Sequence, residues 1–271
     1  MRLVSRRRFL GSAAVMPLAA HTCLAGLVEA PSQSTSDRVH RGCVLVDTGD
    51  HCTLPESLAG FARALEAASI PHRCIGPESI EPGGLILVPG AVLHSIALAD
   101  TLGRLAKLGS TVVYESGAAY ASPEAFRIEQ HLLRAYFGMI IEAPMDLWPG
   151  APSGAAILAA AEGGERLSEP PPTTPPYVHY DWPSTTIVRD FSRAIPLSSA
   201  MMAFSRDAHR AFEPAQAPCH RPIARIGDVP VCCRLRLGDG QFVFLGSPLG
   251  PHLASGDREA QALLQSFLSR S

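Results

Sequence analysis

The polar residues best suited to chemistry lie in three short segments, each of which directly follows a run of apolar residues. These segments are Asp47-Thr48-Gly49-Asp50-His51, Pro89-Gly90-Ala91 and Glu115-Ser116-Gly117-Ala118-Ala119-Tyr120. Short apolar runs are typical of buried parallel strands, and an open parallel sheet binds its ligands outside the carboxyl ends of the strands. The spacing therefore predicts one site that is built from these three loops.

The third segment has the pattern of a nucleophile elbow, in which a strand turns sharply into a helix and exposes one side chain. Glu115 could act there as a general acid or base with a raised pKa, or its carboxylate could cap the helix that it starts. Ser116 could be a nucleophile, but its hydroxyl should point sideways one position from the tip, which favours an N-cap role. His252 is the candidate partner of Glu115 in acid–base chemistry.

The other candidate residues are expected to bind a ligand rather than to react with it. A Pro-Gly pair after a strand frees backbone N–H groups that can line an anion or oxyanion site. The loop after residues 241–245 also follows a strand, so it can form a wall of the same pocket. The expected binding residues are Asp47, Thr48, His51, Pro89, Gly90, Ala91, Gly117, Tyr120 and Ser247.

A metal centre is the less favoured interpretation of the histidines in this region. His51, His72 and His94 could approach one another at the strand ends, with Asp47 nearby. The sequence has no CxxC pair and none of the histidine spacings that are typical of zinc sites. We therefore expect no metal site and no cofactor.

Alternating strands and helices between residues 42 and 148 can position the three loops. Apolar runs predict strands near 43–47, 85–88 and 111–114, with a short additional strand at 71–75. Apolar residues at helical spacing predict helices over 54–69, 95–108 and 123–137. In the second helix, one side carries Ile96, Ala99, Leu102 and Leu105.

The second half of the chain lacks this alternation. Strand patterns cover 185–189, 229–237 and 241–245, and Gly238-Asp239-Gly240 predicts a hairpin between the last two. An amphipathic helix is expected over 256–269. The whole pattern predicts an α/β fold: a doubly wound, mainly parallel sheet of the flavodoxin-like kind, with helices on both faces and an antiparallel extension in the C-terminal half.

The N-terminus has the pattern of an export signal. Ser5-Arg6-Arg7-Arg8-Phe9-Leu10 is followed by an uncharged run from Gly11 to Leu27, and this order resembles a bacterial twin-arginine signal. The predicted organisation is a signal peptide over 1–30, a linker over 31–41 and one α/β domain over 42–271, with a Pro-rich surface loop over 165–180. We expect export by the twin-arginine translocase to the periplasm or the medium, without a lipid anchor at Cys23 and without a membrane-spanning segment in the mature chain.

The composition excludes some classes of partner. The 271 residues include 46% hydrophobic and 18% charged residues, and the formal net charge is −2. A nearly neutral chain offers no strong electrostatic attraction for nucleic acid, and an aromatic content of 6% argues against a platform for stacked bases. A small ligand or another protein is the expected partner.

These motifs, taken in order, resemble the class I glutamine amidotransferase-like superfamily. The resemblance rests on Leu87-Val88-Pro89-Gly90, on Gly109, and on the segment from Tyr114 to Ser122. It is nearest to the domain at the N-terminus of eukaryotic biotin–protein ligases, and it covers residues 42–138 well and the remainder loosely. The resemblance implies a cysteine at the elbow, where this chain has Glu115, and a histidine where it has Ser247.

The two departures bear directly on function. Glutamine hydrolysis by this superfamily needs a thiolate that a histidine activates, and Glu115 and Ser247 cannot replace that pair. Together with the export signal, the resemblance therefore implies an exported protein that has lost the catalytic pair and binds a small ligand or a partner. The alternative is an exported hydrolase or lyase that uses Glu115, with His252 or His51, on an amide or glycosidic substrate.

Overall fold

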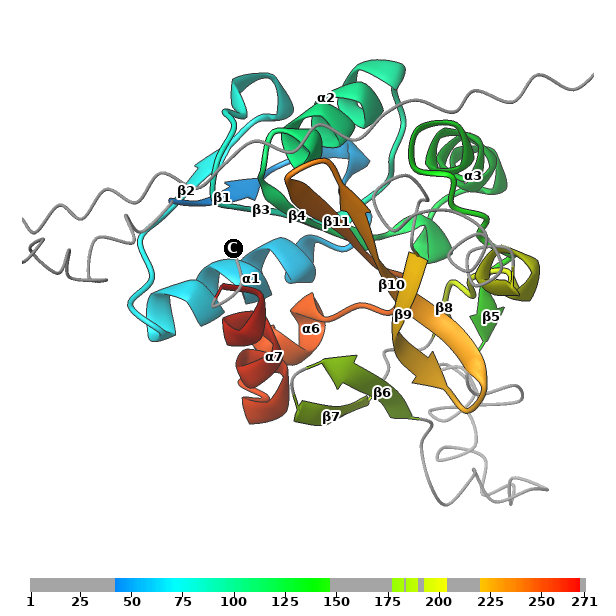
Figure 1. Cartoon of the computed structure of the whole chain (residues 1–271). Helices are drawn as coiled ribbons and strands as arrows, with labels where there is room; N and C mark the ends of the chain where they lie inside the picture. The colour runs from blue at the N-terminus through cyan, green and yellow to red at the C-terminus, as the bar shows by residue number, and fades with distance from the viewer. Residues whose placement is uncertain (1–41, 147–176, 183, 190–192, 204–219, 269–271) are drawn as a thin grey trace, which may run out of the picture. The chain divides into compact units, whose positions relative to one another are not determined.

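A computed structural model describes residues 42–146, 177–182, 184–189, 193–203 and 220–268 (Figure 1). Contacts divide the chain into two units, Met1–Arg38 and Val39–Ser271, and the described residues all belong to the second. The signal peptide, the linker and residues 165–176 of the expected Pro-rich loop lie outside them. Residues 177–180 of that expected loop instead belong to a strand.

The described residues of this unit form a nine-stranded sheet in the order β2-β1-β3-β4-β11-β10-β9-β6-β7. Its first five strands are parallel: β2 (His72–Ile75), β1 (Cys43–Val46), β3 (Leu85–Ala91), β4 (Thr111–Ser116) and β11 (Gly240–Leu245). The other four are antiparallel: β10 (Val229–Leu237), β9 (His220–Ile226), β6 (Tyr177–Trp182) and β7 (Ser184–Arg189). The predicted fold class is confirmed, including the antiparallel extension.

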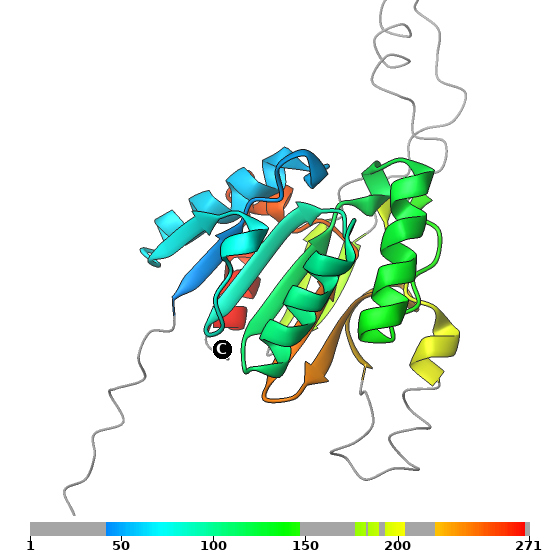
Figure 2. The same ribbon diagram turned by 90° about the horizontal axis from the view of Figure 1, so that it is seen from above.

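Helices cover both faces of the sheet (Figures 1 and 2). One face packs against α2 (Ile96–Lys107) and α3 (Pro123–Phe137), and the other against α1 (Pro55–Ala67), α6 (Gly250–Ala254) and α7 (Arg258–Leu268). Short 3-10 turns follow β1 (Gly49–His51), β2 (Pro77–Ser79) and β4 (Ala118–Tyr120). A two-stranded ladder pairs β5 (Met145–Asp146) with β8 (Arg193–Ala194).

The central strands are buried on both faces, which explains why the sequence shows continuous apolar runs there instead of alternation. In β3, Ile86 faces the α2–α3 side of the core, and Leu85 and Leu87 face the opposite side. The carboxyl ends of β3, β4 and β11 meet at one edge, because these three strands are parallel neighbours. That edge holds the candidate elbow.

The predicted elements are confirmed within a few residues, with one misplaced side chain. Ile96, expected on the buried side of α2, has 66% of its surface exposed because it lies in the first turn of the helix, beside a cleft. The sequence analysis did not predict β6, β9 or the short helix α6. Among the described residues, no helix is both long and apolar enough to cross a membrane.

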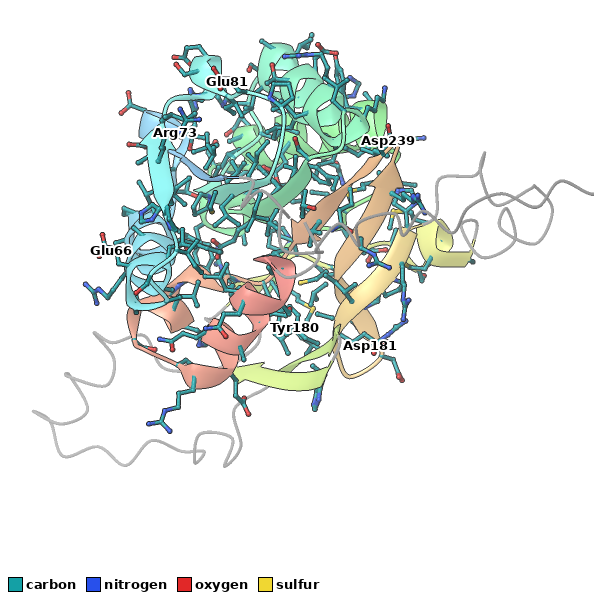
Figure 3. All side chains as sticks on the ribbon, turned by 60° about the vertical axis from the view of Figure 1, so that its left-hand side comes forward. Glu66, Arg73, Glu81, Tyr180, Asp181 and Asp239 are labelled. Atoms are coloured by element: carbon teal, nitrogen blue, oxygen red, sulfur yellow. The ribbon has the colours of Figure 1, made fainter. Side chains whose placement is uncertain are left out.

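Near the edges of the sheet, buried and exposed side chains lie close together (Figure 3). Tyr180 points inward from β6, with its hydroxyl 3.8 Å from the sulfur of Cys232, whereas the neighbouring Asp181 is exposed. Arg73 and Glu81 form an exposed ion pair at 3.9 Å. Exposed pairs of this kind contribute little to stability, so the fold depends on the two apolar layers.

Candidate functional site

The elbow residue Glu115 lies near the carboxyl end of β4 and is completely buried. Its Oε1 accepts hydrogen bonds from the Ser57 hydroxyl at 3.2 Å and from the backbone N–H groups of Leu249 at 2.7 Å and Gly250 at 3.0 Å. Its Oε2 accepts one from the N–H of Gly90 at 3.2 Å. One carboxylate thus connects β4 to β3 and to the first turns of α1 and α6.

The local backbone explains why these donors converge. The register between β3 and β4 shifts between Val88 and Ala91, so the N–H of Gly90 leaves the ladder and turns to Glu115. Gly90 has a φ of +55°, and a Cβ atom there would lie 2.7 Å from the carbonyl oxygen of Leu54. Only glycine fits this position, because both the backbone conformation and the space exclude a side chain.

Two opposing effects act on the pKa of Glu115. Burial raises it, and the hydrogen bonds from Gly250, Leu249, Ser57 and Gly90 lower it. The net result is a pKa of about 7. Burial dominates because the charged form loses its hydration, and four donors replace that hydration only in part. The pKa is raised as expected for an acid–base residue, but the side chain has no exposed surface on which a substrate could meet it.

The turn after β4 differs from the predicted elbow. After Gly117 the chain forms the 3-10 turn Ala118–Tyr120, and α3 begins only at Pro123, with Ser122 as its N-cap. Ser116 is therefore not the N-cap of α3. It is buried, its hydroxyl accepts a hydrogen bond from the N–H of Ala118 at 3.2 Å, and it donates one to Glu129.

Glu129 is a second buried carboxylate, and the sequence analysis missed it. It lies on α3, and it accepts hydrogen bonds from the Tyr114 hydroxyl and the Leu93 N–H, both at 2.7 Å, in addition to that from Ser116. Burial raises its pKa to about 7 against the effect of these donors. Its position three residues before the buried Leu132, on the apolar stripe of an amphipathic helix, was the available signal.

The remaining residues expected around the elbow form buried structure. Pro89, Gly90, Ala91 and Gly117 are buried, and Ser247 has 1% of its surface exposed. None of them lines the three cavities found among the described residues, and the first turns of α1 and α6 pack against this strand end.

The other expected residues contact groups outside the elbow. His252 is on α6 with its Nδ1 atom 4.0 Å from a carboxylate oxygen of Asp257. The Tyr120 hydroxyl accepts a hydrogen bond from the N–H of Arg193 at 3.1 Å, and Asp47 accepts one from the N–H of Gly49 at 2.9 Å.

An open cleft lies one strand away, beside the carboxyl ends of β1 and β3. It has a volume of about 330 Å³, and the first turns of α2 form part of its wall. In a sheet whose order begins β2-β1-β3-β4, the chain reverses its direction of progress between β1 and β3, which is where such folds bind ligands. The lining includes the predicted residues Thr48 and His51, together with Pro77, Glu78, His94 and Ser95.

Two histidines stack at this cleft, as their expected proximity suggested. The rings of His51 and His94 lie 3.3 Å apart between centroids, with an angle of 10° between their planes. Burial and the neighbouring His51 lower the pKa of His94, although its hydrogen bond to the Val92 carbonyl opposes the shift. His72 is not part of the stack. Its Nδ1 atom lies 3.2 Å from the carbonyl oxygen of Ile70. Within the described residues, no three metal-ligating side chains converge.

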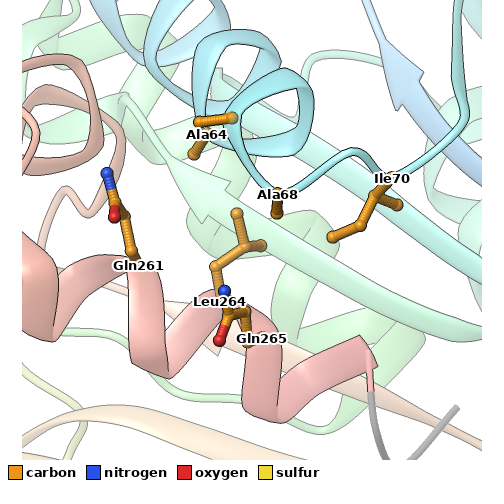
Figure 4. A pocket seen from close by; sticks show the side chains of 7 residues that line it. Ala64, Ala68, Ile70, Gln261, Leu264 and Gln265 are labelled. Atoms are coloured by element: carbon orange, nitrogen blue, oxygen red, sulfur yellow. The ribbon is translucent and has the colours of Figure 1, made fainter.

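A second cleft adjoins the first, and His94 lines both. Its volume is about 310 Å³, and it lies between α2 and α3, with a lining of His94, Ile96, Arg127, Ile128, His131 and Leu132. A third cavity between α1 and α7 measures only about 60 Å³ (Figure 4). It is too small for most ligands and is a packing gap lined mainly by alanines, Leu264 and two glutamines.

Comparison with known proteins adds information on the fold. No family model and no curated protein matches the chain. A β-galactosidase from Bacillus circulans sp. alkalophilus is similar at 14% identity and a TM-score of 0.51, over 85% of this chain and 31% of its own. An exo-β-1,4-mannosidase from Opitutaceae bacterium strain TAV5 is similar at 9% identity and a TM-score of 0.50, over 86% of this chain and 36% of its own.

A third similar structure is covered over nearly its whole length. A ThuA-like protein from Bacteroides uniformis is 11% identical with a TM-score of 0.45, over 90% of this chain and 93% of its own. The chain spans about a third of the length of the two glycosidases. For the two glycosidases, identities this low show a shared fold alone, and folds of this type support many unrelated activities.

Proposed function

We propose that this protein is an exported, catalytically inactive member of the amidotransferase-like superfamily, nearest to the biotin–protein ligase N-terminal domain, and that it binds a small ligand. The observation that carries the proposal is the state of Glu115. Its carboxylate is completely buried and accepts four hydrogen bonds from protein groups. A residue in that state neither attacks a substrate nor exchanges protons with one.

The use of the Gly90 N–H supports the loss of acyl-transfer chemistry. In the resemblance, Pro89-Gly90-Ala91 corresponds to the segment that supplies the oxyanion hole, whose N–H groups stabilise a negatively charged intermediate. Here the N–H of Gly90 donates to Oε2 of Glu115. An internal carboxyl group therefore uses a donor that a reaction intermediate would need.

The alternative, a hydrolase that uses Glu115, receives no comparable support. Glycoside hydrolysis commonly needs two carboxyl groups that flank the scissile bond in an open site. The two buried carboxyl groups, those of Glu115 and Glu129, accept hydrogen bonds on opposite faces of β4. Neither has any exposed surface. The similarity to two glycosidases concerns the fold and does not change this balance.

The proposal is tested by measuring ammonia release from glutamine with the native protein and with Glu115→Gln. We expect both proteins to release ammonia at the background rate. Glu115→Cys should also stay at background, because Ser247 takes the place of the activating histidine. Release by the native protein well above that of Glu115→Gln would show that Glu115 is a working catalytic residue and would overturn the proposal.

A further inference from the structure

We propose that the two adjacent clefts beside α2 form one binding site for a small amphipathic carboxylic acid. The carboxylate would lie at the first turn of α2 in the cleft lined by Thr48 and Ser95, here called the polar cleft. The hydrocarbon part would lie between Ile96 and Ile128 in the cleft between α2 and α3, here called the apolar cleft. This inference rests on the proposed binding function and assigns its site and ligand class.

The polar cleft combines a helix N-terminus with an unpartnered buried hydroxyl. The Ser95 hydroxyl accepts a hydrogen bond from the N–H of Leu98 at 3.2 Å, which leaves the N–H groups of Ile96 and Ala97 without a partner inside the helix. Thr48 has only 7% of its surface exposed, and its hydroxyl has no hydrogen-bond partner among the described residues. Buried hydroxyls are normally paired, so the Thr48 hydroxyl is an unused hydrogen-bonding group beside the cleft, which a rotation of its side chain would bring within reach of a ligand's polar atom.

The apolar cleft exposes large side chains that the fold does not cover. Ile96 and Ile128 have 66% and 47% of their surfaces exposed, and Leu132 beside them is buried. The described part of the chain has four exposed large apolar residues, and two of them line this one cleft. A ligand with a hydrocarbon part would remove their surface from water, which is the main source of affinity in small-molecule sites.

The charges around the clefts favour an anion over a cation. Arg127 lines the apolar cleft, and the N-terminus of α2 carries the positive end of the helix dipole toward the polar cleft. Glu78 is the single acidic residue among those that line the two clefts, and it is exposed at the rim. Because His94 lines both clefts, one small molecule can reach from the apolar side chains to the helix N-terminus.

The test uses octanoate as the probe, with octylamine and acetate as probes that lack the negative charge or the hydrocarbon part. The full chain is labelled at isoleucine methyl groups, and the signals of Ile96 and Ile128 are assigned with the variants Ile96→Val and Ile128→Val. We expect octanoate to shift both signals saturably. Octylamine should not shift them, and acetate should bind far more weakly.

Four variants in matched pairs separate the two contributions. Ile128→Ser should weaken octanoate binding about tenfold, since it removes apolar contact area. Its control, Leu108→Ser, changes an apolar residue that is 57% exposed at the other end of α2 and should leave binding unchanged. Arg127→Gln should weaken binding by about twofold or less, because Arg127 lines the cleft of the hydrocarbon part and acts on the carboxylate only from a distance. Arg104→Gln, an exposed arginine on α2, is the control for that variant.

The outcomes distinguish this inference from the proposed function. Absence of a saturable shift at Ile96 and Ile128, or an equal response to octylamine, would overturn the inference and leave the proposed function standing. Equal weakening by Leu108→Ser and Ile128→Ser would overturn the assignment of the apolar cleft. Octanoate binding at these residues together with ammonia release that depends on Glu115 would overturn the proposed function instead.

Discussion

The two buried carboxylates should make the protein less stable as the pH rises from 5 to 7. Burial raises the pKa of Glu115 and of Glu129 from 4.5 to about 7. In that pH range each side chain is protonated in the folded chain and ionised in the unfolded chain. Unfolding therefore releases a proton from each group, and the free energy of unfolding falls by about 1.4 kcal/mol per pH unit and per group.

Glu115→Gln removes one of these two contributions. The free energy of unfolding that the native protein loses between pH 5 and pH 8 should exceed the loss in the variant by about 2.5 kcal/mol, because the shift from 4.5 to about 7 sets the size of the effect. The amide also lowers stability at every pH, since its NH₂ group would face the N–H of Gly90 or the donors on the other oxygen. That cost of about 1–3 kcal/mol does not depend on pH, so it leaves the slope unaffected.

The measurement is urea denaturation followed by circular dichroism at pH 5, 6, 7 and 8. Glu66→Gln, which changes an exposed carboxylate on α1, is the control and should keep the native slope. A slope that Glu115→Gln leaves unchanged, or a stability that rises with pH through this range, would refute the reasoning. Either result would mean that the four hydrogen bonds outweigh burial and that Glu115 stays ionised in the folded chain.

Two further predictions concern helix packing and export. Gly60→Ala should lower the free energy of unfolding by at least about 1–3 kcal/mol, because the new Cβ would lie 2.0 Å from the carbonyl oxygen of Gly250. Urea denaturation measures this loss. Gly103→Ala, where the nearest atom is 3.8 Å away, should leave stability unchanged or raise it by up to about 1 kcal/mol, and a loss equal to that of Gly60→Ala would contradict the packing argument. Replacement of Arg6 and Arg7 by lysine should keep a reporter fusion in the cytoplasm, and unchanged export of the fusion would exclude a twin-arginine signal.

The sequence predicts the elements of this fold well because two periodicities dominate it. Continuous apolar runs mark the strands β1, β3 and β4, which helices cover on both faces, and the 3.6-residue spacing marks α1, α2 and α3. The strands β6 and β9 were missed. They lie in the antiparallel extension next to residues rich in proline and arginine, where the pattern is weaker.

The site could be predicted only in part, because sequence spacing shows which segments meet but not which atoms are covered. The approach of Glu115 to Gly90 follows from the parallel order of β3 and β4. Its burial depends on the N–H groups of Leu249 and Gly250, more than 130 positions along the chain. No local pattern reveals that contact. The contact between His51 and His94 could be predicted from the sequence, because the two residues follow adjacent parallel strands.

The same edge of the sheet thus contains two strand ends with different chemistry. At the end of β4, the nearby N–H groups donate to Glu115, so the protein itself supplies their acceptor. At the switch between β1 and β3, the first turn of α2 keeps N–H groups that have no partner within the helix, next to the unpartnered hydroxyl of Thr48. A ligand gains hydrogen bonds only where the protein has not already made them. This difference, more than the identity of the residue at the elbow, is the reason for proposing a ligand at the polar cleft.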